Sequence, residues 1–477
     1  MHTTYSLPDI TWLRSFWHRV RAVWRRQPRL VLLANGAVLF GLLFVVSWLK
    51  LDPDFGWHLQ VGNYIRAHGI PAHDIFTYTA PHFPWIDHEW GNDVLVSLLY
   101  GWGGYGLLTA LYAALWTVGL LLAGRRAQLW VLLLATLAVV PYAGIRPVAW
   151  TVCFLAVTVR LLYSPRRRLV WLLPLLFVVW ANLHAGFIIG LAIIAYWGLY
   201  YRRPALFGVV ALSAAATCLN AYGPRLYVEV ARTLFDPTLH QQVGEWAPLS
   251  FWAPVELFMV VWGAGGFLTE SRTIRAWLRP SVPMLLSVFS ANRNVPLFVV
   301  VALAECDGYV RAIRQQFQRQ AGRLARRVAI VAALLAILAG GYWLRASFWP
   351  LNANRAASYP AAAVAYLRQN GCRDGRLFND YNYGGYLIWQ LPTTPLYIDG
   401  RMPSWKDESG QKYMTRYYRL LDYPHDYYAE FARYDVHCVL LRKDSRNAAL
   451  IRLLERDGWQ PAVQDSHSAL LLSPNGS

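Results

Sequence analysis

About eleven apolar runs of membrane-spanning character follow one another between residues 30 and 348. A straight helix needs about 20 residues to cross a bilayer, so the shorter runs would have to recruit flanking residues or cross where the bilayer is thin. Hydrophobic residues make up 56% of the chain and charged residues 15%, against about 25% charged in soluble domains. We therefore expect an α-helical polytopic membrane protein with about 11 transmembrane helices. The expected spans cover residues 30–50, 105–123, 128–143, 148–163, 169–183, 185–200, 204–220, 254–270, 280–291, 295–310 and 328–348.

The basic residues lie in short clusters between the apolar runs, and these clusters indicate how the helices are oriented. If the N-terminus is cytoplasmic, 23 of the 30 Lys and Arg residues before position 349 fall on the cytoplasmic side, and 10 of the 14 acidic residues fall on the other side. This is the positive-inside pattern of multi-pass membrane proteins. Topology thus accounts for the net charge of +18, and we expect no nucleic-acid partner.

This topology divides the chain into three regions. Residues 1–29 form a basic cytoplasmic N-terminus, and residues 30–348 form the transmembrane domain. Residues 349–477 then lie outside the cytoplasm as a separate domain. Two outer loops of the transmembrane domain are long, 51–104 and 221–253.

Short amphipathic helices are expected in both outer loops, at 55–68 and 89–100 in the first and within "GPRLYVEVARTLF" in the second. After about residue 352, short strands alternate with helices, which is the pattern of a small α/β domain. Its expected strands are "RLFND", "PLYIDG" and "VHCVLLR", and its expected helices cover residues 360–370, 408–421, 426–433 and 445–457.

Two carboxylates and a histidine stand where the first apolar run ends, in "LDPDFGWH". Pro53 keeps Asp52 extended, and Asp54 occupies an N-cap position, where its carboxylate would accept the first free N–H groups of the 55–68 helix. Capping explains neither Asp52 nor His58, which lies one turn on from Asp54. The three side chains could instead hold a divalent cation or supply a general base.

The same loop closes with "PWIDHEWGND", which adds further acids and a histidine. If the loop folds back, His88 or Glu89 would meet Asp52 and Asp54. The alternative is that Asp87 or Glu89 only opens the following helix, because acids favour first turns. The first interpretation predicts the catalytic residues Asp52, Asp54, His58 and Glu89, and a Mg²⁺ or Mn²⁺ site made by Asp52, Asp54 and His88.

Polar residues recur where an outer connection joins two apolar runs. Arg146 follows the third run, His184 lies in "WANLHAGF", and Arg293 and Asn294 lie in "ANRNVP". An Arg at such a place is costly to desolvate and needs an anionic partner, either an internal acid or a lipid phosphate that it grips bidentately. With the acids of the first loop nearby, we expect these four residues to bind the phosphate of a donor. Taken alone, His184 is better explained by packing or capping.

In the C-terminal region, "FNDYNYGGYLIW" and "YIDGR" stand out. Gly384 and Gly385 permit a tight turn or a close backbone approach, and tyrosines offer the faces on which sugars stack. Turn formation and core packing are the alternative. The functional interpretation places Asp380, Tyr381, Asp399 and Arg401 on the acceptor side of a site.

The five cysteines show neither metal-binding spacing nor a dense disulfide framework. Cys372 and Cys438 both lie in the C-terminal polar region, so a disulfide between them is one possibility. Cys153, Cys218 and Cys306 fall in or beside apolar runs and are expected to pack.

Several of these motifs together resemble a known group of proteins. "LDPDFGWHLQVGNYIRAHGIPAHDIFTYTAPHFPWIDHEW" is similar to the first outer loop of bacterial multi-pass proteins of the GT-C glycosyltransferase superfamily. "RP", "WANLHAGF", "NRNVPLF" and "LFNDYNYGGYLIWQLP…YIDGR" resemble later signatures of that group, in order. More distantly, "DPDFGWHLQVGNYIRAHG" resembles the acidic start of the first loop in oligosaccharyltransferase catalytic subunits.

The resemblance implies a GT-C-like membrane domain in the bacterial inner membrane and an extracytoplasmic α/β domain. It implies transfer of a sugar from a polyprenyl-phosphate donor to a glycan, lipid or protein acceptor at the outer face. Asp52 or Asp54 would be the base or a metal ligand, and Arg146 and Arg293 would stabilise the departing phosphate. The chain lacks the full sequon-reading motif of oligosaccharyltransferases, which argues against protein N-glycosylation.

Two other classes of function remain open at this point. A lipid or glycan transporter or flippase would carry ionisable residues near the middle of its spans, whereas this chain carries them at span ends. A non-catalytic envelope-assembly protein would keep its function when Asp52 and Asp54 are changed to Asn.

Overall fold

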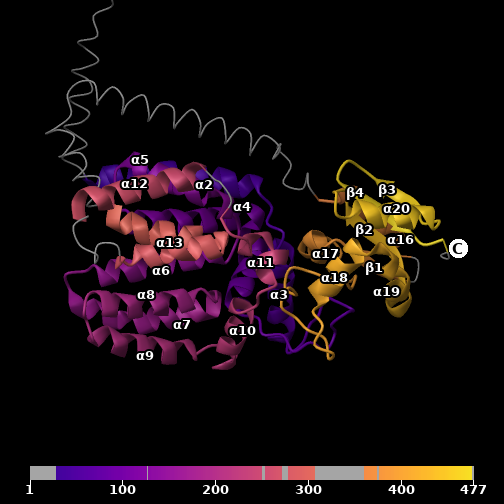
Figure 1. Cartoon of the computed structure of the whole chain (residues 1–477), viewed down its shortest axis with the longest axis horizontal. Coiled ribbons are helices and arrows are strands. Elements are labelled where there is room, and N and C mark those ends of the chain that lie inside the picture. The colour runs from indigo at the N-terminus through magenta and orange to yellow at the C-terminus, as the bar shows by residue number, and fades with distance from the viewer. Residues whose placement is uncertain are drawn as a thin grey trace, which may run out of the picture.

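The computed structural model describes residues 28–125, 127–249, 253–270, 278–306, 359–372 and 375–474. Every expected span within these residues is helical, while the expected span 328–348 lies outside them. The helices pack side by side, and the C-terminal domain lies beyond one end of them (Figure 1). The bundle contains α2 (Pro28–Leu49), α4 (Trp90–Ala123), α5 (Leu129–Val139), α6 (Val148–Leu162), α7 (Leu173–Leu183), α8 (Phe187–Tyr200), α9 (Ala205–Thr217), α12 (Ala253–Glu270), α13 (Ser281–Ser290) and a helix over 295–306.

Within the described residues, two helices are long and apolar enough to cross a membrane, α2 and α4. Most of the other apolar helices have 10–17 residues, so the fold is mainly helical as expected but the count of about 11 spans is not confirmed. α4 joins the expected helix at 89–100 to the expected span at 105–123 across a kink at Gly104, whose φ is 61°. Turns of 3-10 helix at Val140–Tyr142 and Arg167–Leu172 extend α5 and precede α7.

Large aromatic side chains fill the interior of the bundle, and large aliphatic ones remain on its outside. Trp116 and Trp180 are fully buried, whereas Leu33, Leu175 and Leu199 are exposed. Apolar side chains on the outward face of helices that already bury a core suit contact with lipid better than contact with water.

The connections between helices alternate between the two ends of the bundle. The connections that contain Asp52, Arg146, His184 and Arg293 all border one cavity and therefore lie at the same end. The basic connections at Arg166–Arg168 and Arg202–Arg203 join the opposite ends of the same helices. This is the arrangement that the charge pattern predicts.

The two long outer loops lie between the bundle and the C-terminal domain (Figure 1). α3 (Phe55–His68) has the predicted bounds, and Phe55 contacts Trp389 of the C-terminal domain edge to face at 5.2 Å. The second loop contains α10 (Arg225–Leu234), as predicted, then α11 (Leu239–Gln242) and a 3-10 turn at Gly244–Trp246. A further 3-10 turn, Asn292–Asn294, follows α13.

The C-terminal domain is a four-stranded sheet with helices, in strand order β1-β2-β4-β3. β1 and β2 are parallel, and the other pairs are antiparallel. The strands are β1 (Arg376–Asn379), β2 (Val436–Arg442), β3 (Gln460–Gln464) and β4 (Ser468–Leu472), and the helices are α16 (Ala361–Asn370), α17 (Gly384–Gln390), α18 (Tyr413–Asp422), α19 (Tyr427–Tyr434) and α20 (Ala448–Arg456), with 3-10 turns at Tyr381–Tyr383 and Pro424–Asp426. The sequence pattern does not predict β3 and β4.

The expected strand 395–400 is not a regular strand. Leu396 forms isolated bridges to Thr77 of the first outer loop and to Leu377 of β1. The Tyr397 N–H donates to the side chain of Asn379 instead of to a neighbouring strand. This segment therefore joins the first outer loop to the C-terminal domain.

Further contacts join the C-terminal domain to the two outer loops. The Thr79 hydroxyl donates to the Tyr397 carbonyl at 2.7 Å, and Lys412 forms an ion pair with Asp236 of the second loop. A disulfide joins Cys372, just after α16, to Cys438 in β2. This is the pairing that the sequence left open.

Candidate functional site

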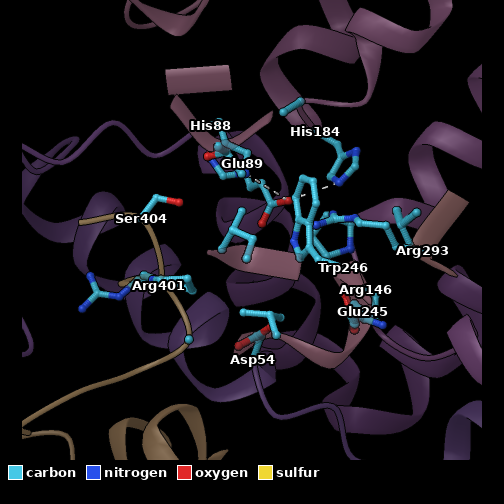
Figure 2. Close-up of a pocket in the computed structure, with 18 of the residues that line it drawn as sticks. Asp54, His88, Glu89, Arg146, His184, Glu245, Trp246, Arg293, Arg401 and Ser404 are labelled. Carbon is cyan, nitrogen blue, oxygen red and sulfur yellow. Dashed lines mark hydrogen bonds and ion pairs between the residues drawn. The ribbon is translucent and has the colours of Figure 1, made fainter. Parts of the chain in front are cut away.

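A cavity of about 770 Å³ lies where the end of the bundle, the two outer loops and the C-terminal domain meet. Figure 2 shows Asp54 and Glu89 on opposite sides of it, with Arg146 and Arg293 along one flank. Of the residues predicted for a site, the cavity is lined by Asp52, Asp54, His58, His88, Glu89, Arg146, His184, Arg293, Asn294, Tyr381 and Arg401.

Asp52 and Asp54 have different partners, although they are two residues apart. The Asp52 carboxylate accepts the Asp54 N–H at 3.0 Å and forms an ion pair with Arg146 at 3.0 Å. The Asp54 carboxylate accepts the indole N–H of Trp57 at 2.9 Å. Burial, and then repulsion from Asp52, raises the pKa of Asp54 to about 6. Asp54 therefore combines an accessible carboxylate with a pKa close to neutrality.

The predicted capping role of Asp54 is wrong. Asp54 precedes α3, but its backbone is already helical (φ −90°, ψ −13°) and its side chain makes no capping hydrogen bond. A cap needs extended backbone at this position, so the carboxylate turns to Trp57 instead. It is the Asp52 carboxylate that accepts a backbone N–H at this helix entrance.

Glycines of the C-terminal domain press directly against the acidic start of the first loop. A Cβ on Gly400 would lie 2.1 Å from Asp54 Oδ1, and a Cβ on Gly385 would lie 2.0 Å from the Pro53 carbonyl oxygen. Gly56 lies against the carbonyl oxygen of Gly385 in the same way, since a Cβ on Gly56 would lie 1.9 Å from that oxygen. The conspicuous glycines of "YNYGGY" and "IDGR" thus allow close backbone approach.

Arg146 has internal acids as partners. Its guanidinium pairs with Asp52 and with Glu245 of the second outer loop. These carboxylates hold the pKa of Arg146 above its usual range although burial opposes them. In turn, Arg146 and Arg293 hold the pKa of Glu245 below its usual range against the effect of burial. Of the two partners that the sequence allows for Arg146, an internal acid or a lipid phosphate, the structure shows the internal acid.

Arg293 differs from Arg146 because Glu245, the acid that attracts it most strongly, forms its ion pair with Arg146 instead. Its guanidinium lies over the ring of Trp246, 4.7 Å from the centroid. Within the described part of the chain, the Arg293 side chain forms no ion pair with a carboxylate. Burial lowers the pKa of Arg293, although the group stays charged at neutral pH. The adjacent Asn294 donates to the Ser287 carbonyl at 3.0 Å.

Glu89 lies among three histidines. Its Oε1 atom is 3.4 Å from His184 Nε2 and 3.6 Å from His88 Nε2, and its Oε2 atom is 3.7 Å from His58 Nε2 (Figure 2). Burial raises the pKa of Glu89 to about 8, and repulsion from Asp93 adds to this effect. Burial lowers the pKa of His88 to about 4 and that of His184 well below its usual value. At neutral pH this cluster therefore has a protonated Glu89 carboxyl beside the neutral imidazoles of His88 and His184.

The predicted cation ligands do not form a ready cation site. Among the described residues, no group of three or more His, Cys, Asp or Glu side chains is arranged to hold a metal ion. Asp52 is occupied by Arg146, and His88 lies toward Glu89. Asp52, Asp54 and His88 thus share a cavity without converging on one point.

The residues predicted on the acceptor side separate into two groups. Tyr381 and Arg401 line the cavity, but the cavity lining does not include Asp380 or Asp399. Asp380 accepts the Asn382 N–H and the side chain of Asn447 inside the C-terminal domain. Asp399 accepts the Arg401 guanidinium at 2.6 Å.

Arg401 also reaches the first outer loop, where it pairs with Asp74 at 2.6 Å. Its guanidinium lies 4.6 Å from the ring centroid of Trp85 and 2% of the side chain is exposed. In Figure 2 it points away from the centre of the cavity. The ion pair with Asp74 joins the C-terminal domain to the first outer loop. Because Arg401 is paired with two acids, other side chains supply the charge that faces the cavity.

Some lining residues were not predicted as site residues. They include Trp57, Thr151, Glu229, Glu245 and Trp246. An acid next to an aromatic residue in "QQVGEWAP", inside a predicted outer loop, was the available signal for Glu245 and Trp246. Thr151 lies in an apolar helix and has no signal of its own.

Comparisons with solved structures identify the architecture. The chain is similar to the archaeal oligosaccharyltransferase AglB from Archaeoglobus fulgidus in complex with an inhibitory peptide and a dolichol-phosphate, with a TM-score of 0.58 and 12% identity over 85% of this chain and 69% of that one. The apo form gives 0.51 and 11%, and the form tethered with an acceptor peptide containing the NVT sequon gives 0.54 and 13%, with the same coverage. No family model and no curated protein sequence matches the chain. The distant similarity to oligosaccharyltransferase catalytic subunits is confirmed at the level of the fold.

Proposed function

We propose that the chain is a membrane glycosyltransferase that moves a sugar from a polyprenyl-phosphate-linked donor to an acceptor at the extracytoplasmic face. The observation that carries this proposal is the cavity at the end of an apolar bundle, which holds Asp54, Glu89 and Arg293 together. The likeness to AglB, one of whose structures contains a dolichol-phosphate, supports a lipid-linked donor. The acceptor is a glycan, a lipid or a protein.

Asp54 is the better candidate for the base. A general base must be ionised and accessible, and a pKa of about 6 leaves Asp54 mostly ionised at neutral pH. Asp52 is held by Arg146 and by a backbone N–H, so it has less freedom to take a proton. Asp54 would remove the proton of the acceptor hydroxyl as that oxygen attacks the anomeric carbon.

Glu89 and Arg293 suit the departing phosphate. As the bond between the sugar and the phosphate breaks, its electron pair passes to the phosphate oxygen, where negative charge develops. The Arg293 guanidinium would stabilise that charge, and the protonated Glu89 would supply a proton to the same oxygen. Two acids with separated pKa values in one cavity can serve as base and acid in the same turnover.

The disulfide supports the proposed location. Disulfides persist in oxidising compartments and are rare in the cytosol, and the Cys372–Cys438 bond lies in the C-terminal domain. We therefore place that domain outside the cytoplasm, at a bacterial inner membrane. The cavity, which the domain borders, then opens at the same face.

The predicted Mg²⁺ or Mn²⁺ requirement remains part of the proposal. If a cation binds, Asp52, Asp54 and His88 are the residues expected to hold it, and it would add positive charge near the donor phosphate. No step described above depends on it.

The test is release of polyprenyl phosphate by the purified protein from a panel of polyprenyl-phosphate sugars, with and without Mg²⁺ or Mn²⁺. Water can replace the acceptor in slow hydrolysis, so the acceptor need not be known. We expect release from at least one donor, and we expect Asp54→Asn and Arg293→Ala to abolish it. Asp435→Asn and Arg225→Ala, at exposed positions away from the cavity lining, are the matched controls.

Absence of release from every donor at pH values on both sides of neutrality would contradict the proposal. A transporter or a non-catalytic assembly protein would then be favoured. Release that survives in both Asp54→Asn and Arg293→Ala would retain an enzyme but remove the site assignment.

A further inference from the structure

The hydrogen bonds around Glu89 have a direction that can be derived from two tryptophans. An indole N–H can only donate, so each hydrogen-bond chain that begins at a tryptophan has fixed donors and acceptors. One chain begins at Trp150 and reaches His58, and the other begins at Trp180 and reaches His184.

In the first chain, Trp150 Nε1 donates to Asn92 Oδ1 at 3.1 Å. The amide oxygen of Asn92 is therefore the acceptor, and its Nδ2 donates to Asp93 Oδ1 at 3.2 Å. An oxygen that accepts from Asn92 suits a second donor, so His58 Nδ1, which lies 2.6 Å away, is assigned as the donor to Asp93 Oδ1. A neutral His58 then has a bare Nε2, and this atom faces Glu89 Oε2.

In the second chain, Trp180 Nε1 donates to Thr151 Oγ1 at 2.9 Å. His184 Nδ1 accepts the backbone N–H of Gly186 at 3.0 Å and lies 2.6 Å from Thr151 Oγ1. The proton of a neutral His184 is therefore on Nε2, and this atom faces Glu89 Oε1. The two histidines present opposite tautomers to the two oxygens of one carboxyl group.

We propose that Asp93 is a positioning residue that fixes the tautomer of His58, so that the bare Nε2 of a neutral His58 is held toward Glu89 Oε2 in the cavity. His184 supports the same arrangement by donating to Oε1. This inference deepens the proposed function, on which its catalytic part rests. The separations are 3.4 Å for His184 and 3.7 Å for His58, and catalytic hydrogen bonds tighten when substrate binds.

In a turnover, the proton balance is as follows. The acceptor O–H bond breaks and its proton goes to Asp54, while the sugar forms a bond to the acceptor oxygen. The bond from the sugar to the phosphate oxygen breaks, and the Glu89 proton goes to that oxygen. Water then returns a proton to Glu89 and removes one from Asp54.

The surroundings suit a positioning role for Asp93. The residue is fully buried at the contact between α3 and α4, and its carboxyl group also interacts with that of Asp87. Asp93 is not in the cavity lining, so it would act through His58. The charged and titratable groups that face Glu89 are His58 from α3, Asp93 from α4, His184 after α7, Asp87 and His88 from its own loop, and Asp54 and Arg293 across the cavity.

The first test needs no substrate. Nitrogen-15 NMR of the full-length protein labelled at histidine distinguishes protonated from bare ring nitrogens, and His58→Gln and His184→Gln identify the two signals. We expect His58 to carry its proton on Nδ1 and His184 on Nε2. A His58 proton on Nε2 in the unsubstituted protein would overturn the inference, whatever the activity.

The second test compares Asp93→Leu with Asp93→Asn in the release assay. Leu has nearly the same shape but no acceptor, whereas Asn keeps an acceptor oxygen and so should keep the His58 tautomer. We expect Asp93→Leu to lower kcat about 100-fold, at the low end of acid–base contributions, with the donor KM within about threefold. Asp93→Asn should lose less than about tenfold.

The tautomer of His58 separates positioning from a structural role. With the acceptor removed in Asp93→Leu, His58 can place its proton on Nε2, and the same histidine NMR experiment detects this change. The His58 tautomer should therefore change in Asp93→Leu and stay in place in Asp93→Asn. A structural role would lower thermal stability in both variants without changing the tautomer.

The double variant His58→Gln with Asp93→Leu should be no less active than His58→Gln alone, because Asp93 acts through His58. If Asp93→Leu does not fold, the His58 tautomers in the unsubstituted protein and in Asp93→Asn still decide the inference. An unsubstituted protein that releases nothing would refute the proposed function, and the tautomers would still be measured.

Discussion

Replacing Gly400 with Ala should displace the Asp54 carboxylate while leaving the fold in place. The added Cβ would lie 2.1 Å from Asp54 Oδ1, and ordinary contact begins at 3.4 Å, so the oxygen must retreat by about 1.3 Å. The obstructing atom is the end of a side chain, which can rotate away more easily than backbone can shift. The rotation breaks the 2.9 Å hydrogen bond from Trp57.

The magnitude follows from this displacement. A misplacement of about 1 Å at a reacting group can cost about 100-fold in rate, which corresponds to about 2.7 kcal/mol of transition-state stabilisation. The cost to folding is that of one hydrogen bond, about 1 kcal/mol. Gly400→Ala should therefore lower kcat about 100-fold with only a small loss of thermal stability.

Two other glycines provide controls of opposite kind. A Cβ on Gly385 would meet the Pro53 carbonyl at 2.0 Å, so Gly385→Ala pushes backbone against backbone and should weaken docking of the C-terminal domain. Gly101, at an exposed position inside α4, has no atom within 4 Å of an added Cβ, so Gly101→Ala should leave kcat unchanged and should not lower thermal stability. The assays are polyprenyl-phosphate release and thermal unfolding of each full-length variant.

An unchanged kcat in Gly400→Ala would contradict this reasoning. If Gly400→Ala keeps kcat within about threefold of the unsubstituted protein, the position of Asp54 does not limit catalysis and its assignment as base fails. Gly400→Ala should also add no further loss in an Asp54→Asn background. An added loss there would mean that Gly400 acts through something other than this carboxylate.

The pH dependence of kcat should be bell-shaped, with limbs near 6 and 8, because Asp54 must be ionised and Glu89 protonated; a profile without the acid limb would exclude Asp54 as the base. Arg293→Ala should raise the donor KM and lower kcat, with Arg293→Lys intermediate because it keeps the charge but not the fork; equal kinetics in both variants would show that charge is not what Arg293 supplies. Cys438→Ser should destabilise the C-terminal domain by about 2–4 kcal/mol in denaturant unfolding, with Cys218→Ser, at a free cysteine, as control. EDTA should lower release and Mg²⁺ or Mn²⁺ should restore it; release unaffected by EDTA would remove the predicted cation requirement.

Local signals in the sequence were enough to predict several elements. Pro53 and Asp54 before an amphipathic run give α3 its bounds, and "VHCVLLR" between polar residues gives β2 its bounds. β3 was missed because "QPAVQ" contains a proline and little apolar alternation. The segment 395–400 looked like a strand, but its backbone groups bond to the first outer loop and to Asn379. The Leu396 N–H donates to the carbonyl of Phe76, which is more than 300 positions away, so a local pattern does not predict this bond.

The candidate site was predictable in its residue types but not in its pairing. Acids at the exit of the first apolar run and Arg at later helix ends indicated a charged site at one face, and these side chains do line one cavity. Which acid is free could not be predicted, because the partner of Asp52 is Arg146 and the second partner of Arg146 is Glu245. Only the folded chain brings those three segments together.

The contrast between Asp54 and Glu89 explains why a single cavity can hold two acids with different roles. Desolvation raises both pKa values, and repulsion adds to it, from Asp52 at Asp54 and from Asp93, Asp87 and Asp54 at Glu89. His58, the Trp57 indole N–H and Arg146 all favour the ionised form of Asp54, and its pKa stops near 6. At Glu89 the opposing influence is that of His58, and the pKa reaches about 8. Asp54, just before α3, is thus ready to take a proton, and Glu89, just before α4, is ready to give one. The transferase proposal depends on that difference.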